Sequence, residues 1–243
     1  MKSKGYKKFE NRMNFFRIDV ELVDVLFKNK ESIKDSIHIF KNVDKENHPL
    51  LVARTSSTGS RRIVMSHLRK TIYVSFLKDL YEEVTEYIRY ILYQASQQGV
   101  SADRIIGEHT FKMNANKILS LSTRGEIVKV IIDQVFQQLE AERSTIELFQ
   151  KIKNKLGLDD INQSLIDQAV PYLTCRHIFV HTDGKPNDDF KTKYPDIPLD
   201  KKGRIFLDVD FLNKAYTSIN TLLKEIDKSL ITKKYIPNSE LQP

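Results

Sequence analysis

The segment RRIVMSHLRKTIYVSFLKDLYEEVTEYIRYILYQASQQ, residues 61–98, decides the fold class because it contains neither glycine nor proline. Its apolar residues recur at steps of three and four, at Met65, Leu68, Ile72, Phe76, Leu80, Val84, Ile88 and Ile91. That spacing places them on one face of a single α-helix. Gly99 follows directly and is a typical helix end. The pattern therefore predicts a long amphipathic helix that is buried along one side.

Three further stretches repeat this periodicity. The first begins at Gly125, the second runs from about residue 162 to residue 181, and the third from about residue 208 to residue 231. Residues 14–27 predict an additional helix near the amino end. Because strand-like alternation is nearly absent, the sequence predicts an all-α fold, a bundle of four or more helices with an N-terminal helical extension.

Two irregular segments divide the pattern. Residues 47–60 contain Pro49 and a run of serine and threonine, which predicts a flexible connection. We therefore expect an extension over residues 1–55, the bundle over 56–235 and a flexible tail over 236–243. Residues 183–206 carry three prolines and two glycines, so they predict a long loop of the kind that often has a function.

Composition indicates an ordinary globular chain of 243 residues, with 40% hydrophobic and 29% charged residues. Its single cysteine, Cys175, excludes a disulfide-stapled class and suits a reducing compartment. The basic amino end lacks the apolar core of a signal peptide, and no stretch reaches the roughly 20 apolar residues that span a bilayer. We therefore expect a cytoplasmic protein without a membrane partner.

Charge indicates a preferred class of partner. Lys and Arg number 39 against 32 Asp and Glu, which gives a net charge of +7. Such an excess favours polyanions, first nucleic acid and then acidic membrane surfaces, although it also serves solubility alone. No phosphate-binding glycine loop, paired-cysteine zinc motif or Gly-x-Ser-x-Gly elbow is present, so a kinase or ATPase is not indicated and no cofactor is expected.

Two of the six histidines, His177 and His181, lie four positions apart near the end of a predicted helix. That spacing suits two imidazole ligands of a zinc ion. However, Ile178 stands where a His-Glu-x-x-His protease needs its glutamate, and no third histidine or cysteine ligand lies nearby in sequence. We therefore predict no metal site, and a polar helix end is the simpler structural interpretation.

The segment RHIFVH, residues 176–181, places Arg176 five positions before His181. It resembles the Arg-x4–6-His signature of the HEPN superfamily, whose members form α-helical bundles. Spacing alone is weak support, because chance predicts about one such match in a chain of this composition. Residues 182–185 then form a turn-like stretch, and a loop and a last helix follow, as in HEPN proteins. The resemblance covers about residues 60–232.

Two other arginine–histidine pairs have a matching spacing, Arg62 with His67 (Arg61 lies one position farther) and Arg104 with His109. HEPN proteins usually carry a polar residue directly after the arginine. Only Arg176 has one, because isoleucine follows both competitors. This context favours the Arg176 motif.

The resemblance implies a metal-independent endoribonuclease that acts as a homodimer with a composite site. Many relatives are toxins or anti-phage defence effectors, some of them restrained by an antitoxin or a sensor protein. Certain HEPN toxins extend the motif to a tyrosine two positions after the histidine, but Asp183 occupies that position here. Control by tyrosine modification is therefore not expected.

Metal-free RNA cleavage needs a base for the 2′-hydroxyl, an acid for the leaving 5′-oxygen, and positive charge on the phosphorane. The pKa of histidine suits either proton role, and arginine offers a permanently charged fork that matches phosphate oxygens. We assign phosphate clamping to Arg176 and acid–base work to His181. His177 is a secondary candidate that orients the substrate or is merely structural. Two protomers supply two histidines and two arginines, enough for both proton transfers.

A docking surface for RNA is predicted around the start of the long helix. Arg61, Arg62, Arg69 and Lys70 cluster there although cations oppose the dipole of a helix N-terminus, and Lys185 follows the motif. Tyr81, Tyr87, Tyr90 and Tyr93 are candidates for stacking on bases, although Tyr87 lies near the apolar stripe and is more simply a core residue. Two alternatives remain open: a non-catalytic HEPN module that binds nucleic acid or a partner protein, and an unrelated helical interaction protein.

Overall fold

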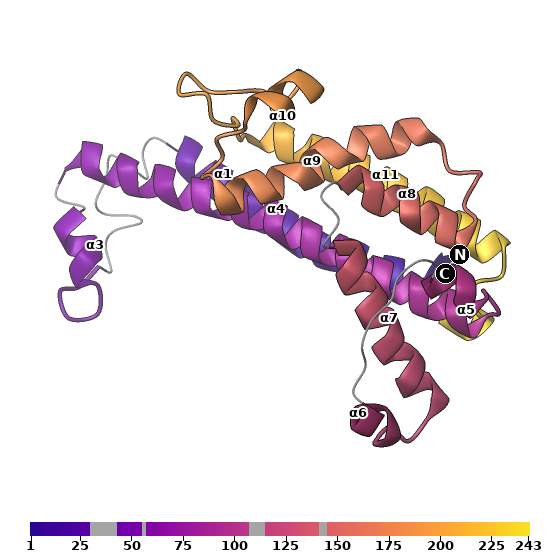
Figure 1. Cartoon of the computed structure of the whole chain (residues 1–243). Helices are drawn as coiled ribbons and strands as arrows, with labels where there is room; N and C mark the ends of the chain where they lie inside the picture. The colour runs from indigo at the N-terminus through magenta and orange to yellow at the C-terminus, as the bar shows by residue number, and fades with distance from the viewer. Residues whose placement is uncertain (30–42, 55–56, 107–114, 141–144) are drawn as a thin grey trace.

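A computed structural model describes residues 1–29, 43–54, 57–106, 115–140 and 145–243, and these are helical almost throughout (Figure 1). In chain order the helices are α1 (Lys4–Lys28), α3 (Pro49–Arg54), α4 (Thr58–Gln97), α5 (Ala102–Ile106), α6 (Ala115–Leu119), α7 (Arg124–Glu140), α8 (Thr145–Leu156), α9 (Gln163–His181), α10 (Asp188–Lys193) and α11 (Val209–Thr232). The all-α prediction is confirmed. In the described part of the chain, no helix is long and apolar enough to cross a membrane.

Helix α4 is the axis of the molecule. It runs for 40 residues, about 60 Å at 1.5 Å per residue. Ser57 caps its start, where the side chain accepts a hydrogen bond from the backbone N–H of Ser60. Helices α1, α9 and α11 pack along it and form the bundle, and α7 leaves it at an angle (Figure 1). Most of the predicted apolar stripe is buried, but Leu68 is exposed near the N-terminal end, which extends beyond the bundle.

Helix α1 belongs to the same core as α4. We expected a helix over residues 14–27, within an extension that ends at residue 55. The helix begins ten residues earlier, at Lys4, and its Tyr6, Phe9 and Met13 are buried in the core that α4 and α11 share. The amphipathic spacing of these three residues therefore docks α1 against the bundle, and α1 is not a separate unit.

The two ends of the chain meet. Residues 236–243, expected as a flexible tail, contain a 3-10 helix (Asn238–Glu240) and the strand β2 (Leu241–Gln242). This strand pairs antiparallel with β1 (Lys2–Ser3). The buried carboxylate of Asp227 in α11 accepts two hydrogen bonds from Ser3 of β1. One comes from the Ser3 hydroxyl, and the other, at 2.9 Å, from its backbone N–H. Tyr87 of α4 donates a third hydrogen bond, at 3.1 Å, so one carboxylate joins three elements.

The predicted loop of residues 183–206 is largely ordered by local backbone contacts. It contains the short helix α10, which Asn187 caps by accepting from the N–H of Phe190. Leu199 and Ile205 form a β-bridge, and the N–H of Ile205 donates to the carbonyl of Gly184 at 2.8 Å. The loop therefore folds back over the end of α9, where the arginine–histidine motif lies.

Candidate functional site at the end of helix α9

Helix α9 ends directly after the motif. The backbone N–H groups of Thr182 and Gly184 cap this end of the helix, because both donate to the carbonyl of Ile178, at 2.9 and 3.2 Å. Asp183 and Gly184 adopt left-handed backbone conformations, with φ of 50° and 82°. A side chain at position 184 would meet the ring of Phe179, so glycine is required there. The turn reverses the chain and leaves the last residues of α9 at the surface.

The three predicted catalytic residues come together at this helix end. His177 and His181 are exposed, and their ring centroids lie 4.3 Å apart, as the spacing of four residues dictates on a helix. The Arg176 guanidinium is half-buried and lies over the ring of Tyr81 in α4, 4.9 Å from its centroid. Tyr81, predicted as a base-stacking residue, therefore stacks on the motif arginine.

The electrostatic environment of the pair favours neutral imidazole at His177. Partial burial lowers the pKa of His177 below its usual value, and repulsion from His181 and Arg176 lowers it further. A neutral imidazole can accept a proton near neutral pH, where a protonated one cannot. The helix end thus presents a proton acceptor beside a permanent positive charge.

Two further cations lie beside the motif. The Asp183 carboxylate accepts from Lys70 of α4 at 3.1 Å and pairs with Arg204 at 3.1 Å, and both cations lower its pKa. Lys70 was predicted as an RNA-binding residue, and Lys185, two positions past Asp183, is exposed. Arg204 was not predicted. Its only sequence signal is the basic run of residues 201–204, which lies 20 residues beyond the motif.

The other predicted RNA-binding arginines differ in exposure. Arg62 is exposed, whereas Arg61 is only 8% exposed and donates to the hydroxyl of Thr58 at 3.2 Å. Arg69 lies over the ring of Phe27, 3.7 Å from its centroid, and 3.8 Å from a carboxylate oxygen of Asp24. Arg61 and Arg69 therefore make contacts within the fold, and Arg69 fastens α1 to α4.

The two competing arginine–histidine pairs lie elsewhere in the chain, outside helix α9. Arg62 and His67 are both exposed on the N-terminal part of α4. Arg104 is also exposed and donates to the backbone carbonyl of Asn154 at 3.3 Å, while His109 lies outside the described residues.

Among the residues described, no three histidine, cysteine or acidic side chains are grouped so that they could hold a metal ion. Cys175, beside the motif, is buried, and burial raises the pKa of its thiol to about 12.

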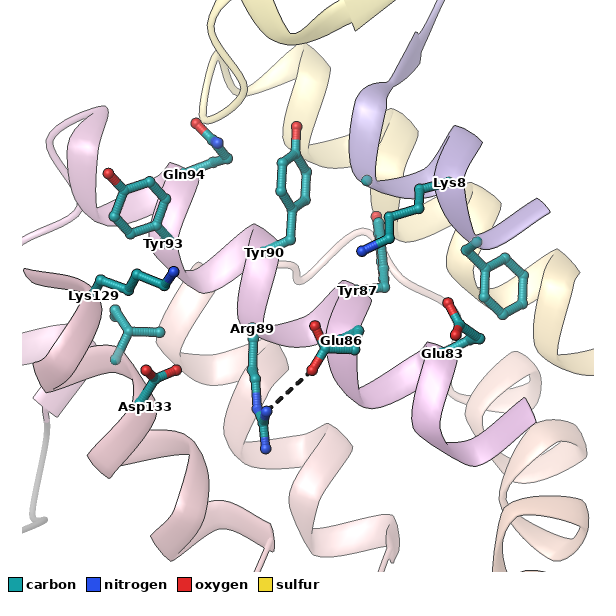
Figure 2. A pocket seen from close by; sticks show the side chains of 13 residues that line it. Lys8, Glu83, Glu86, Tyr87, Arg89, Tyr90, Tyr93, Gln94, Lys129 and Asp133 are labelled. Atoms are coloured by element: carbon teal, nitrogen blue, oxygen red, sulfur yellow. Dashed lines mark hydrogen bonds and ion pairs between the residues drawn. The ribbon is translucent and has the colours of Figure 1, made fainter. Parts of the chain in front are cut away.

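A separate pocket of about 580 Å³ lies between α1, α4 and α7 (Figure 2). Glu86 and Arg89 on its wall pair at 3.1 Å, and Glu83 pairs with Arg12 at 2.9 Å. The sequence did not predict this pocket. Tyr90 and Tyr93, predicted to stack on bases, line it, and the ring of Tyr90 occupies the space that a side chain at Gly5 would need. Several of its side chains therefore hold α1 and α4 together.

Comparisons of the chain with protein-family models, with curated proteins and with solved structures find no match. The chemistry of the site must therefore be read from its own side chains. Two imidazoles can exchange protons with a substrate, and the guanidinium of Arg176 can bind an anion whose charge grows during reaction. The end of α9 thus combines the groups that phosphodiester cleavage requires.

Proposed function

We propose that this protein is a metal-independent endoribonuclease of the HEPN type, acting as a homodimer with a composite site. The observation that carries the proposal is the surface cluster of Arg176, His177 and His181 at the end of α9, with the arginine held on Tyr81. The all-α bundle and the net charge of +7 agree with it. By its resemblance to HEPN proteins, the chain serves in the cytoplasm as a toxin or anti-phage effector, with an antitoxin or sensor protein as its restraint.

In the proposed reaction, a neutral imidazole takes the proton of the ribose 2′-hydroxyl, whose oxygen attacks the adjacent phosphorus. The bond from phosphorus to the 5′-oxygen breaks, and a protonated imidazole gives that oxygen its proton. The products are a 2′,3′-cyclic phosphate and a free 5′-hydroxyl. His181 of each protomer takes one of the two proton roles, and Arg176 stabilises the charge of the phosphorane. His177 orients the substrate or His181.

A test of this function needs purified protein, mixed RNA and excess EDTA. We expect cleavage to cyclic-phosphate ends, and a loss of roughly 100-fold or more for His181→Ala and for Arg176→Ala, the scale of a lost proton-transfer or charge-stabilising group. His67→Ala is the matched control, because His67 is an exposed histidine that also lies five positions after an arginine. Its activity should equal that of the wild type.

Three outcomes would contradict the proposal. Full activity of His181→Ala would remove the assigned acid–base residue. Cleavage that EDTA abolishes would indicate that the His177 and His181 pair holds a metal. A folded dimer that binds RNA without cleaving it would instead support the non-catalytic binding module.

A further inference from the structure

Helix α1 carries a row of large apolar side chains on its surface. Phe15 is 71% exposed, Ile18 58%, Leu22 56% and Val25 64%. These residues follow one another at steps of three, four and three, so they lie along one side of the helix over about 15 Å. We call them the α1 stripe. No described segment of the chain covers it.

The α1 stripe lies on the side of α1 that faces away from the core. The residues that α1 buries, among them Phe9, Met13, Val20 and Val23, follow the same kind of spacing on the opposite side of the helix. Isolated exposed leucines are common, but a continuous row of four large apolar side chains marks an interaction surface. Steps of three and four are the pattern of the a and d positions in a coiled coil.

Acidic side chains border the α1 stripe. Asp19 and Glu21 lie on its two sides, and neither forms a hydrogen bond or ion pair with the described residues. The nearby cations Arg12 and Lys28 are already paired, at 2.9 and 2.7 Å, with carboxylates of the fold, and the guanidinium of Arg17 lies over the ring of Tyr216, 4.5 Å from its centroid. The charge left for a partner beside the stripe is therefore negative, although the whole chain is positive.

This charge disfavours a second copy of the chain as the occupant. If two α1 helices met antiparallel about a two-fold axis, each Asp19 would face the Asp19 of the other copy. If they met parallel, Asp19 would face Asn14 of the other copy and Glu21 would face its Leu26, because each g position meets the e position five residues further on. The antiparallel arrangement thus brings like charges together, which destabilises a coiled coil, and the parallel one leaves both carboxylates without a cation at the positions that normally carry opposite charges.

We propose that the α1 stripe is the docking surface for an amphipathic helix of another protein, with apolar residues at heptad spacing and lysine or arginine on both sides. The apolar residues of that helix cover Phe15, Ile18, Leu22 and Val25, and its cations pair with Asp19 and Glu21. The surface is independent of the ribonuclease proposal, because Arg176 and His181 do not take part in it.

The test uses fluorescence anisotropy with two labelled three-heptad peptides and the full chain. Both peptides carry leucine at a and d, but one has lysine and the other glutamate at e and g. We expect the lysine peptide to bind at least tenfold more tightly. The double variant Asp19→Lys and Glu21→Lys should reverse this preference. The double variant Ile18→Asp and Leu22→Asp should bind neither peptide and keep the wild-type thermal unfolding, since both positions are exposed.

Equal binding of the two peptides, or binding that survives the aspartate substitutions, would overturn the proposal. So would sedimentation showing a dimer of the chain that Ile18→Asp and Leu22→Asp disperse, because a second copy would then be the occupant. RNA cleavage measured on the same samples tests the proposed function separately, and either result can fail without the other.

Discussion

The guanidinium of Arg176 lies 4.9 Å from the centre of the Tyr81 ring. The arginine that begins the motif on α9 is therefore held against α4, 95 positions earlier in the chain. A cation over an aromatic face is attracted by about 0.5–2 kcal/mol, depending on how far it is desolvated. Tyr81 thus restricts where the Arg176 guanidinium can lie, and in the proposed reaction it would be a positioning residue.

Replacing Tyr81 should affect cleavage through Arg176. We expect Tyr81→Leu to lower kcat/KM for RNA about tenfold, equivalent to about 1.4 kcal/mol of lost stabilisation. Tyr81→Phe retains the ring face and should stay within about threefold of the wild type. Thermal unfolding of both variants is the control for packing. Equal losses in the two variants would show that the ring does not position the arginine.

Both protomers should be required for each reaction in a composite site. We expect that mixing wild type with an equal amount of His181→Ala, under conditions of subunit exchange, halves the activity of the wild-type chains, and that a threefold excess leaves about a quarter. The reason is that mixed dimers lack one of the two proton-transfer groups. Co-purification of untagged wild type with affinity-tagged variant confirms that exchange has occurred. Activity that the variant leaves unchanged would mean that each protomer acts alone.

The periodic spacing of apolar residues predicted the long helices that bury one apolar face. The stretch 61–98 forms most of α4 because apolar residues at steps of three and four fall on one face of a helix, so local spacing alone predicts the element. The clustering of His177 with His181 followed from the same period. In contrast, α8 was not predicted, although its buried Phe149, Ile152 and Leu156 recur at steps of three and four. The helix has only 12 residues, so this pattern spans just about two turns and gives a weak signal.

Partners far apart in sequence could not be predicted. Arg69 contacts Asp24 and Phe27, more than 40 positions earlier, and nothing in its own neighbourhood indicates that α1 packs there. The bridging of Lys70 and Arg204 by Asp183 likewise depends on how the loop folds over α9. The sequence can thus place a charge on a helix, but only tertiary packing decides whether that charge faces solvent.

Asp227 should be important for stability because it accepts hydrogen bonds from two donors of Ser3 and from Tyr87. We expect Asp227→Ala to lower the free energy of unfolding by about 3 kcal/mol, since buried donors would lose their acceptor. Asp227→Asn should cost less, because its amide oxygen still accepts. Urea denaturation measures both. A loss within 0.5 kcal/mol, roughly the effect of an ordinary surface substitution, would contradict this role.

The turn after His181 should depend on Gly184. Its φ is 82°, and an added Cβ would lie 2.5 Å from a ring atom of Phe179. We expect Gly184→Ala to destabilise the fold by about 2 kcal/mol and to reduce cleavage, since the strained backbone and the clash both act on the motif helix. Gly203→Ala is the matched control: its φ is 72°, and no atom lies within 4 Å of the added carbon. Equal destabilisation of the two variants would exclude the Phe179 contact as a cause.

The protonation of His177 gives a pH-dependent prediction. Burial, His181 and Arg176 lower its pKa in the folded state, whereas the unfolded chain has the ordinary value near 6.5. Because the unfolded state then binds the proton more readily, stability falls as the pH drops below about 6.5 and stops falling below the folded-state pKa. We expect His177→Gln to lose less stability than the wild type between pH 7.5 and 5, as urea denaturation can measure. In proton NMR titrations, Arg176→Gln should raise the pKa of His177 because it removes a repelling charge. An unchanged pKa in that variant would show that Arg176 and His177 do not interact electrostatically.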